Sequence, residues 1–328
     1  MRRKAAASFR SLFPVFVLLF ASSLSSQTDI AEGKNHFQQK KYSQAEKIFK
    51  SIIDNDSKNA EAHFYLGRIY FIQGNYEDAV KAHENAVKVN ENNPEYQFYL
   101  GQSYTRRIGE VNMFSQMRMA GKMKKAYEKA VELAPNDPEK KFGLMMWYAE
   151  APGIAGGSME KAETFAQEIN ELDALWGSRA FLEIYKKNGD TEKTIQTSNE
   201  ILQHDPDNED IYISLTNTYI QQKQYDEAFA LYSNLIERNP DKVFAYYQVG
   251  KLASVSGKNL DDGENALRKY LEMERRPDDP SEAWAHYRLG TIFEHRSDLA
   301  NAQKEFETAL KLEENHEEAK KALKRIKK

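Results

Sequence analysis

The chain has 328 residues, of which 41% are apolar and 29% charged, so its composition excludes both a disordered chain and a membrane-embedded one. Its 46 Lys and Arg against 50 Asp and Glu leave a formal net charge of −4, which excludes the basic excess that nucleic-acid binding requires. No cysteine is present, which excludes disulfides, a thiol nucleophile and cysteine-ligated zinc or iron–sulfur sites.

Residues 1–26 have the layout of a secretory signal peptide. A positive start at residues 2–4 precedes an uninterrupted apolar run from Leu12 to Ala21, and small residues follow up to Ser26. This run is about half of the roughly 20 residues that a membrane-spanning helix needs. We therefore expect cleavage and export to the periplasm or the medium, with no stable membrane insertion afterwards. An uncleaved N-terminal anchor is the alternative.

From about residue 27 onward, small residues recur at a spacing of 34. The recurring sets are Gly33, Gly67 and Gly101, then Ala45 and Ala79, and later Pro206 and Pro240. Such a period predicts helix–turn–helix units in which small residues let the paired helices approach closely. One pair cannot bury its apolar face alone, so successive pairs are expected to stack.

These residues resemble the tetratricopeptide repeat family, whose units carry Leu-Gly and an aromatic on the first helix and Ala, an aromatic and Ala on the second. In the second unit the slots are Leu66, Gly67, Tyr70, Ala79, His83 and Ala86, and in the eighth Leu289, Gly290, Phe293, Ala302, Phe306 and Ala309. The resemblance implies an all-α, right-handed superhelix of about eight units over residues 27–314. The units start near residues 26, 60, 94, 138, 175, 209, 243 and 283, and the fourth and fifth match most weakly. Residues 315–328 are expected to form a polar capping helix.

Two departures interrupt the repeat. The third unit carries about ten added residues, which predict a second helix extended at its start. This Met-rich extension, residues 111–123, could line an adaptable binding surface or simply cover the neighbouring unit. The fourth unit has a long Gly-rich loop, residues 150–159, that ends in Ser158, a plausible helix N-cap. No Gly-Lys-Ser/Thr follows it, so it is not a P-loop; its glycines suit a long turn, although glycines beside a helix N-terminus could also hold an anion.

No catalytic constellation is present in the sequence. His63 and His83 fall in core-facing slots, and nucleophile and metal-binding motifs are absent. The stretch from Asp205 to Asp210 lacks the central Gly and distal Glu of a calcium loop. We therefore expect no enzyme activity, no cofactor and no metal site.

Aromatic and basic residues recur on the first helices, in slots that the family resemblance places on the concave groove. The candidate partner-binding residues are Phe64, Arg68, Phe98, Phe142, Phe244, Tyr247, Lys251, Trp284, Tyr287 and Arg288. Such a groove could hold an extended peptide with aromatic anchors, although the same rings could serve only to wedge adjacent helices together. The family's carboxylate-gripping set is matched only at Asn217 and Arg288, which does not carry that activity across.

The sequence thus predicts a non-enzymatic protein-interaction scaffold in the bacterial envelope, with a protein partner and no nucleic acid. The alternative is a periplasmic carrier of a small ligand or glycan, whose pocket would form between the long third-unit helix and the Gly-rich loop. That alternative predicts ligand binding that depends on Trp147 or Tyr148.

Overall fold

The computed structural model describes residues 29–277 and 279–327, and within these ranges every regular element is a helix and none is a strand. The all-α prediction is confirmed. The expected signal peptide, residues 1–26, lies outside the described residues. No helix in the described ranges combines the length and the apolar character needed to cross a membrane.

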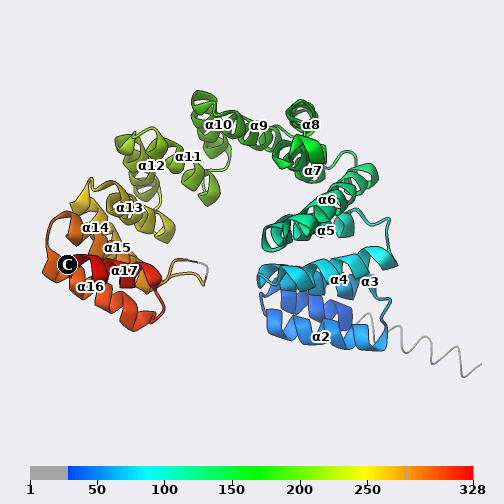
Figure 1. The fold of residues 1–328 in the computed structure, drawn as a ribbon, viewed down its shortest axis with the longest axis horizontal. Helices are drawn as coiled ribbons and strands as arrows, with labels where there is room; N and C mark the ends of the chain where they lie inside the picture. The colour runs from blue at the N-terminus through cyan, green and yellow to red at the C-terminus, as the bar shows by residue number, and fades with distance from the viewer. Residues whose placement is uncertain (1–28, 278, 328) are drawn as a thin grey trace, which may run out of the picture. The chain divides into compact units, whose positions relative to one another are not determined.

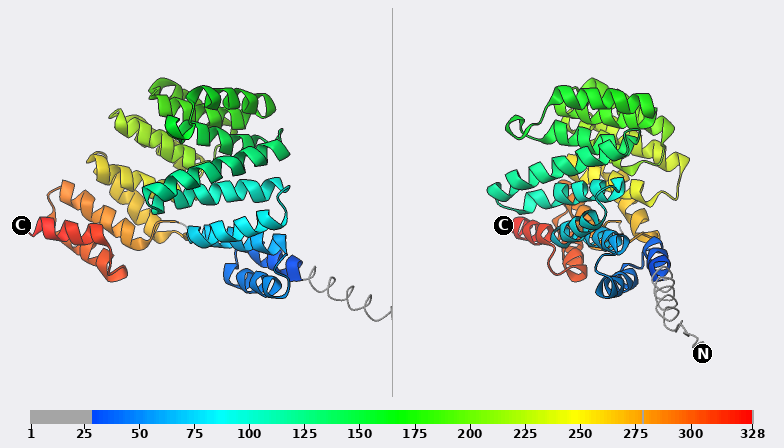
Figure 2. Two further views of the ribbon diagram at one scale, coloured as in Figure 1. Left: turned by 45° about the vertical axis from the view of Figure 1, so that its right-hand side comes forward. Right: turned by 90° about the vertical axis from the view of Figure 1, so that its right-hand side faces the viewer.

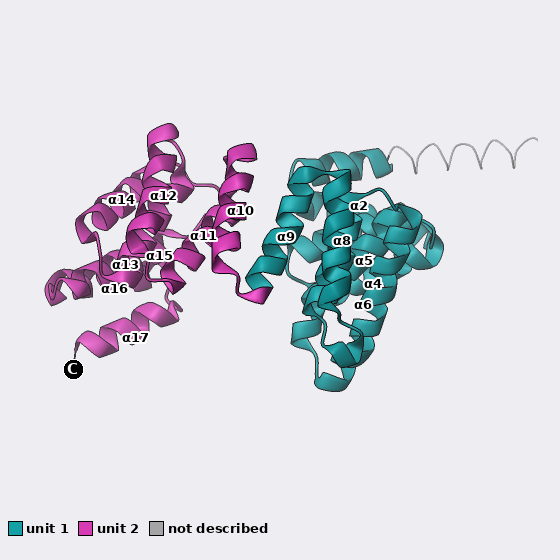
Figure 3. Ribbon diagram, turned by 90° about the horizontal axis from the view of Figure 1, so that it is seen from above, with its two compact units in different colours: residues 1–187 teal, residues 188–328 magenta. Residues whose placement is uncertain are grey.

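The chain forms two compact units, residues 1–187 and 188–328 (Figure 3). In the first unit a helix over residues 29–38 precedes the elements α2 (Tyr42–Asn55), α3 (Ala60–Ile72), α4 (Tyr76–Val89), α5 (Pro94–Arg107), η1 (Ile108–Glu110), α6 (Met113–Leu133), α7 (Pro138–Glu150), η2 (Gly153–Ala155), α8 (Met159–Leu172) and α9 (Ala174–Asn188). The second contains α10 (Thr191–His204), α11 (Glu209–Gln221), α12 (Tyr225–Arg238), α13 (Val243–Ser256), α14 (Leu260–Glu272), α15 (Glu282–His295), α16 (Leu299–Leu312) and α17 (Glu317–Ile326). Within each unit consecutive helices pack in pairs (Figures 1 and 2).

The first helices of several pairs begin at capped and proline-marked positions. Asn59, Asn93 and Asp137 each accept a hydrogen bond from a backbone N–H in the first turn of α3, α5 and α7. Pro94 and Pro138 follow two of these caps at the start of the helix, where a missing N–H leaves no hydrogen bond unmade. Local sequence therefore sets where these helices start.

Glycines on the first helices let rings on the second helices approach the backbone. A Cβ on Gly67 would lie 2.6 Å from the His83 ring, and one on Gly101 would lie 2.7 Å from the Tyr127 ring. Both contacts are too short for any side chain but glycine's hydrogen. The repeat of small residues thus reflects helix–helix contact rather than flexibility, and it explains why the repeating pattern folds as stacked pairs.

The third pair contains the expected extension. Helix α6 has 21 residues, whereas the second helices α2 and α4 have 14 each. The 3₁₀ turn η1 and the N-cap Asn112, which accepts a hydrogen bond from Ser115, lead into this longer helix. The added residues therefore lengthen the helix at its start and also form the short turn before it.

The loop after α7 is shaped by two glycines. Gly156 adopts a φ of +97°, which favours glycine, and a Cβ on Gly157 would lie only 1.8 Å from the carbonyl oxygen of Ala151. Ser158 caps α8 by accepting a hydrogen bond from the backbone N–H of Lys161. The turn interpretation of these glycines and the N-cap at Ser158 are confirmed.

The second unit ends in α17, which covers apolar side chains of α15 and α16. Ala322 is buried with Phe293 and Phe306, and the half-buried Leu323 and Ile326 pack against the same cluster. Arg325 of α17 forms an ion pair with Glu294 of α15 at 2.6 Å. Helix α17 thus covers apolar side chains of α15 and α16, which is what the expected capping role requires.

Candidate functional site

The described residues contain no group of three or more His, Asp or Glu side chains that could hold a metal ion. His83 is fully buried, and burial lowers its pKa to about 3. Its Nδ1 lies 2.8 Å from the hydroxyl oxygen of Ser103 on α5. This histidine is therefore neutral at physiological pH and belongs to the packing of α4 against α5.

The predicted aromatic residues of α13 are buried rather than open to a partner. Phe244 is 7% exposed and Tyr247 is 5% exposed. Phe244 packs edge-on against Tyr232 of α12, and Tyr247 contacts Tyr270 of α14 with 5.2 Å between ring centroids. These rings wedge neighbouring helices together, which is the packing role that the sequence left open.

Lys251 and Arg288 form a pair of cations on neighbouring first helices, α13 and α15. Burial lowers the pKa of Lys251, and the positive charge of Arg288 lowers it further. The guanidinium of Arg288 lies 5.6 Å and 5.2 Å from the ring centroids of Trp284 and Tyr287. Within the described part of the chain, neither cation pairs with a carboxylate. The two cations thus leave a positive charge uncompensated on this face of the second unit.

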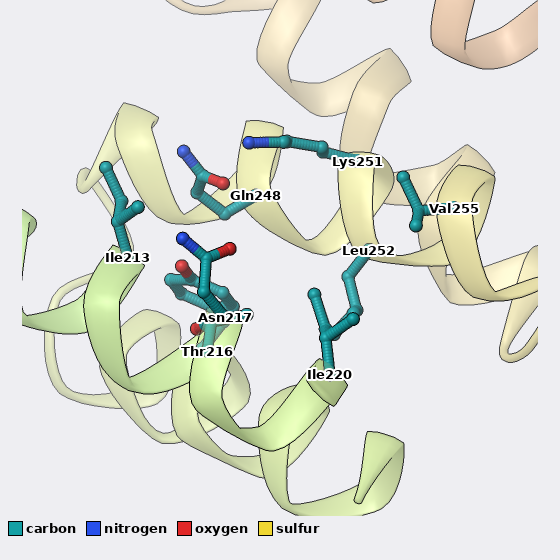
Figure 4. Close-up of a pocket in the computed structure, with 9 residues that line it drawn as sticks. Ile213, Thr216, Asn217, Ile220, Gln248, Lys251, Leu252 and Val255 are labelled. Carbon is teal, nitrogen blue, oxygen red and sulfur yellow. The ribbon is translucent and has the colours of Figure 1, made fainter. Parts of the chain in front are cut away.

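Polar groups from α11 and α13 extend the same face. Figure 4 shows the amides of Asn217 and Gln248 and the ammonium of Lys251 gathered over the space between the two helices. The cavity beneath them is only about 20 Å³, which is room for about one water molecule. These groups therefore offer hydrogen bonds to something lying across the surface rather than to a ligand buried beneath it.

At the end of the second unit, Trp284 and Tyr287 contact the capping segment. The ring of His316, the N-cap residue of α17, lies 4.3 Å from Trp284 and 5.3 Å from Tyr287, measured between centroids. Both aromatic side chains remain half-buried. The sequence did not reveal this contact, because nothing in the repeat pattern indicates which side chains the final helix covers.

In the first unit, the predicted residues Phe64 and Arg68 belong to an aromatic cluster. The guanidinium of Arg68 lies between the rings of Phe37 and Tyr99, at 4.8 Å and 4.7 Å from their centroids. Phe64 is buried against Tyr96 of α5. Arg68 therefore ties together rings from three successive first helices.

The remaining predicted residues of the first unit, Phe98 and Phe142, line a pocket with a volume of about 630 Å³. Its walls come from α5, α6, α7, the loop after α7 and the first turn of α9, with Phe71 of α3 and Ile108 of η1. Trp147 lines the pocket as well, whereas Tyr148 lies in the adjoining core. This volume falls within the range of small-molecule sites, roughly 300–1,000 Å³.

Both departures from the repeat contribute to this pocket. Ala120 and Met123 come from the lengthened α6, and Ala151 and Pro152 come from the long loop. Lys124 of α6 reaches toward the loop side, with its ammonium 5.1 Å from the Trp147 ring centroid. The folded chain places the two insertions around one pocket, as the alternative interpretation of the sequence expected.

The chain matches family models described as tetratricopeptide repeat over residues 30–94, 73–138 and 247–319, and over residues 186–251. A search of curated proteins finds no match. Among solved structures, it is similar to a tetratricopeptide repeat protein from Parabacteroides merdae, with 15% identity, a TM-score of 0.55, and coverage of 82% of this chain and 99% of that one. A thermophilic TPR protein of Thermus thermophilus shows 15% identity and a TM-score of 0.50, with coverage of 60% and 99%. A human IFIT1 dimer with m7Gppp-AAAA shows 17% identity and a TM-score of 0.50, with coverage of 90% and 71%. At these identities the structural likeness concerns the fold.

Proposed function

The chain belongs to the tetratricopeptide repeat family, and from that premise we propose that it is a non-enzymatic scaffold of the bacterial envelope that holds an extended segment of a partner protein. The bound segment lies across α11, α13 and α15 of the second unit and carries at least one carboxylate. The net charge of −4 offers no excess of positive charge to a nucleic acid, which agrees with a protein as the proposed partner.

The observation that carries this proposal is the uncompensated cation pair Lys251 and Arg288. Burying a cation beside another cation is unfavourable, and the lowered pKa of Lys251 is the expression of that penalty. A carboxylate of the partner would relieve the repulsion and accept charge-assisted hydrogen bonds from both groups. Charged groups held in unfavourable surroundings on an open face are typical of binding sites.

Neighbouring residues supply the rest of a peptide-binding surface. Asn217 and Gln248 can hydrogen-bond to the backbone of an extended segment, and the half-buried Trp284 and Tyr287 offer apolar faces beside the cations. Aromatic and arginine side chains dominate the energetics of protein interfaces. The site therefore combines one charged anchor, several backbone contacts and one aromatic anchor.

Export is part of the proposal and rests on the layout of residues 1–26. Fractionation of the producing cells, followed by N-terminal sequencing of the recovered protein, tests it. A mature N-terminus near residue 27 in the periplasm or medium supports export, and a full-length cytoplasmic protein refutes it.

The partner site is tested by crosslinking in the native envelope and mass spectrometry of the attached proteins. Three proteins are compared: wild type, the double variant Lys251→Met and Arg288→Gln, and the matched control Lys304→Met, which removes an exposed cation on α16. A partner recovered with wild type and control but lost from the double variant supports the site. Peptides tiled across that partner then identify the bound segment, whose affinity should fall at least tenfold in the double variant. Equal recovery with all three proteins rejects the proposal.

A further inference from the structure

We propose that the pocket of the first unit, formed by α5, α6, α7 and the loop after α7, binds a small organic cation with an elongated apolar body. This site is separate from the partner surface of the second unit and does not depend on it.

The pocket extends along the helices because α5 and α7 run in parallel. Glu95 pairs with Lys140 at 2.5 Å, and three residues further along both helices the ring of Phe98 meets Gly143, where a Cβ would lie 2.8 Å away. The lining residues of α7 run from Glu139 in its first turn to Glu150, which is the last residue of the helix. At the helical rise per residue this distance is roughly 16 Å. The occupant is therefore elongated.

The middle of the pocket is apolar and partly adaptable. Phe98, Phe142 and Trp147 supply ring surfaces, and Met123 and Met146 supply thioether side chains that adjust to the shape of a ligand. Burial of an apolar body here supplies most of the affinity, at about 25 cal/mol for each Å² removed from water.

One end of the pocket is acidic and aromatic. Glu139 lines it beside Trp176 and Phe142, whose rings meet edge to face at 5.5 Å. Lys140, the nearest cation on α7, is already shared between Glu95 and Asp137, at 2.5 Å and 2.6 Å. Glu139 makes no ion pair within the described residues. A carboxylate beside ring faces is the combination that recognises ammonium groups.

The electrostatics of Glu139 agree with this geometry. Burial raises the pKa of its carboxyl, and repulsion from Glu95 and Asp137 raises it further, outweighing the opposing effects of the cations Lys140 and Arg68. A cation bound beside Glu139 would relieve both effects. A positively charged head group beside Glu139 would therefore stabilise this end of the pocket, and a negatively charged one would destabilise it further.

The opposite end of the pocket fixes the orientation. Arg106, in the last turn of α5, lines that end, and Glu150 there is paired with Lys187 at 3.0 Å. Among the described residues that line this end, Arg106 is the one charge without an ion pair, and its positive charge repels a cationic head group. The head group therefore lies beside Glu139 and the apolar tail points toward Arg106.

The test uses dodecyltrimethylammonium below its micellar concentration, with dodecanoate as a probe of equal chain length and opposite charge. Two of the three tryptophans of the chain, Trp147 and Trp176, line the pocket. Full-length protein carrying Trp284→Phe therefore reports occupancy by tryptophan fluorescence, and isothermal titration calorimetry gives the stoichiometry. We expect saturable binding of one cation per chain, with dodecanoate binding at least about tenfold more weakly.

Variants locate the site. Glu139→Gln should weaken binding of the cation about five- to tenfold, which is the size of one partly exposed charge interaction, while leaving dodecanoate unchanged or tighter. Glu163→Gln, the same change at an exposed position of α8, is the matched control and should bind as the parent does. Ala120→Phe fills the pocket and should abolish binding of both probes, provided that its circular dichroism spectrum is unchanged.

Either of two results overturns the proposal. Absence of saturable binding by both probes rejects the pocket as a ligand site. Equal affinity for the two probes, or no effect of Glu139→Gln on the cation, rejects the cationic head group. Both results leave the proposed partner site of the second unit unaffected, because that site is tested separately with variants of Lys251 and Arg288.

Discussion

Acid should destabilise the first unit through the buried neutral His83. Its ring is fully buried, its Nδ1 lies 2.8 Å from the Ser103 hydroxyl oxygen, and its Nε2 has no hydrogen-bond partner in the described structure. Burial lowers its pKa to about 3 from the ordinary value of 6.5. The folded state therefore takes up this proton far less readily than the unfolded state does.

The sign and size of the effect follow from proton linkage. Because the folded pKa is depressed, His83 lets the protein keep its full stability above pH 6.5, and stability is lost as pH falls toward 3. At pH 5 the unfolded-state pKa is about 1.5 higher than the pH, and each unit is worth about 1.4 kcal/mol. His83 alone should thus lower the free energy of unfolding by about 2 kcal/mol between pH 7 and pH 5.

The comparison needs a variant in which this proton site is gone and the packing is kept. Phe49 and Phe306 occupy the corresponding slot in other pairs, each against a glycine, so His83→Phe should fit beside Gly67. Ser103→Ala is combined with it, so that no buried hydroxyl is left without a partner.

Urea unfolding at pH 7 and pH 5, followed by the fluorescence of Trp147 and Trp176 in a Trp284→Phe background, reports on the first unit. The parent should lose about 2 kcal/mol more than the double variant on acidification. Equal losses in the two proteins would refute the reasoning, since every other titrating group is common to both.

Further predictions concern packing and the capping helix. Gly250→Ala places a Cβ 2.1 Å from Cγ of Leu267 and should lower the free energy of unfolding of the second unit by about 1–3 kcal/mol in urea titrations. Gly121 lies on an exposed face of α6, and a Cβ added there would meet no neighbouring side chain within 4 Å. Gly121→Ala should therefore raise the free energy of unfolding of the first unit by up to about 1 kcal/mol, and a decrease would contradict this expectation. Removal of residues 317–328 should speed hydrogen exchange in α15 and α16, because α17 covers their apolar side chains, and unchanged exchange would show that it caps nothing.

The fold could be predicted because its determinants are local and periodic. Gly67 and Gly101 mark the positions where a ring from the partner helix touches the backbone, so their spacing in the sequence repeats the spacing of the helix pairs in space. Asn93 with Pro94, and Asp137 with Pro138, mark helix starts for a chemical reason that needs no knowledge of the rest of the chain.

The candidate site was harder to predict from the sequence, because aromatic residues at groove positions serve different purposes in different pairs. Phe244 and Tyr247 share the aromatic character of Phe142, yet they are buried by helices of their own unit whereas Phe142 lines a pocket. The difference lies in the neighbours, because the lengthened α6 and the long loop line the pocket together with Phe98 and Phe142. Partner binding at the ten predicted groove residues stays a prediction, which the crosslinking experiment addresses for Lys251 and Arg288.

By itself the sequence determined the helical class, the pairing of helices and the places where the repeat departs from its period, since these depend on spacing, capping and close contact between neighbours in the chain. Tertiary structure alone decided that Trp147, and not Tyr148, lines the pocket between the two departures, that Lys251 lies beside Arg288 with no carboxylate partner among the described residues, and that His316 covers Trp284. The physical reason is that burial and electrostatic fields depend on every group within a few ångströms, including groups far apart in the sequence. A repeating pattern specifies the contacts that recur, and these three contacts each occur once.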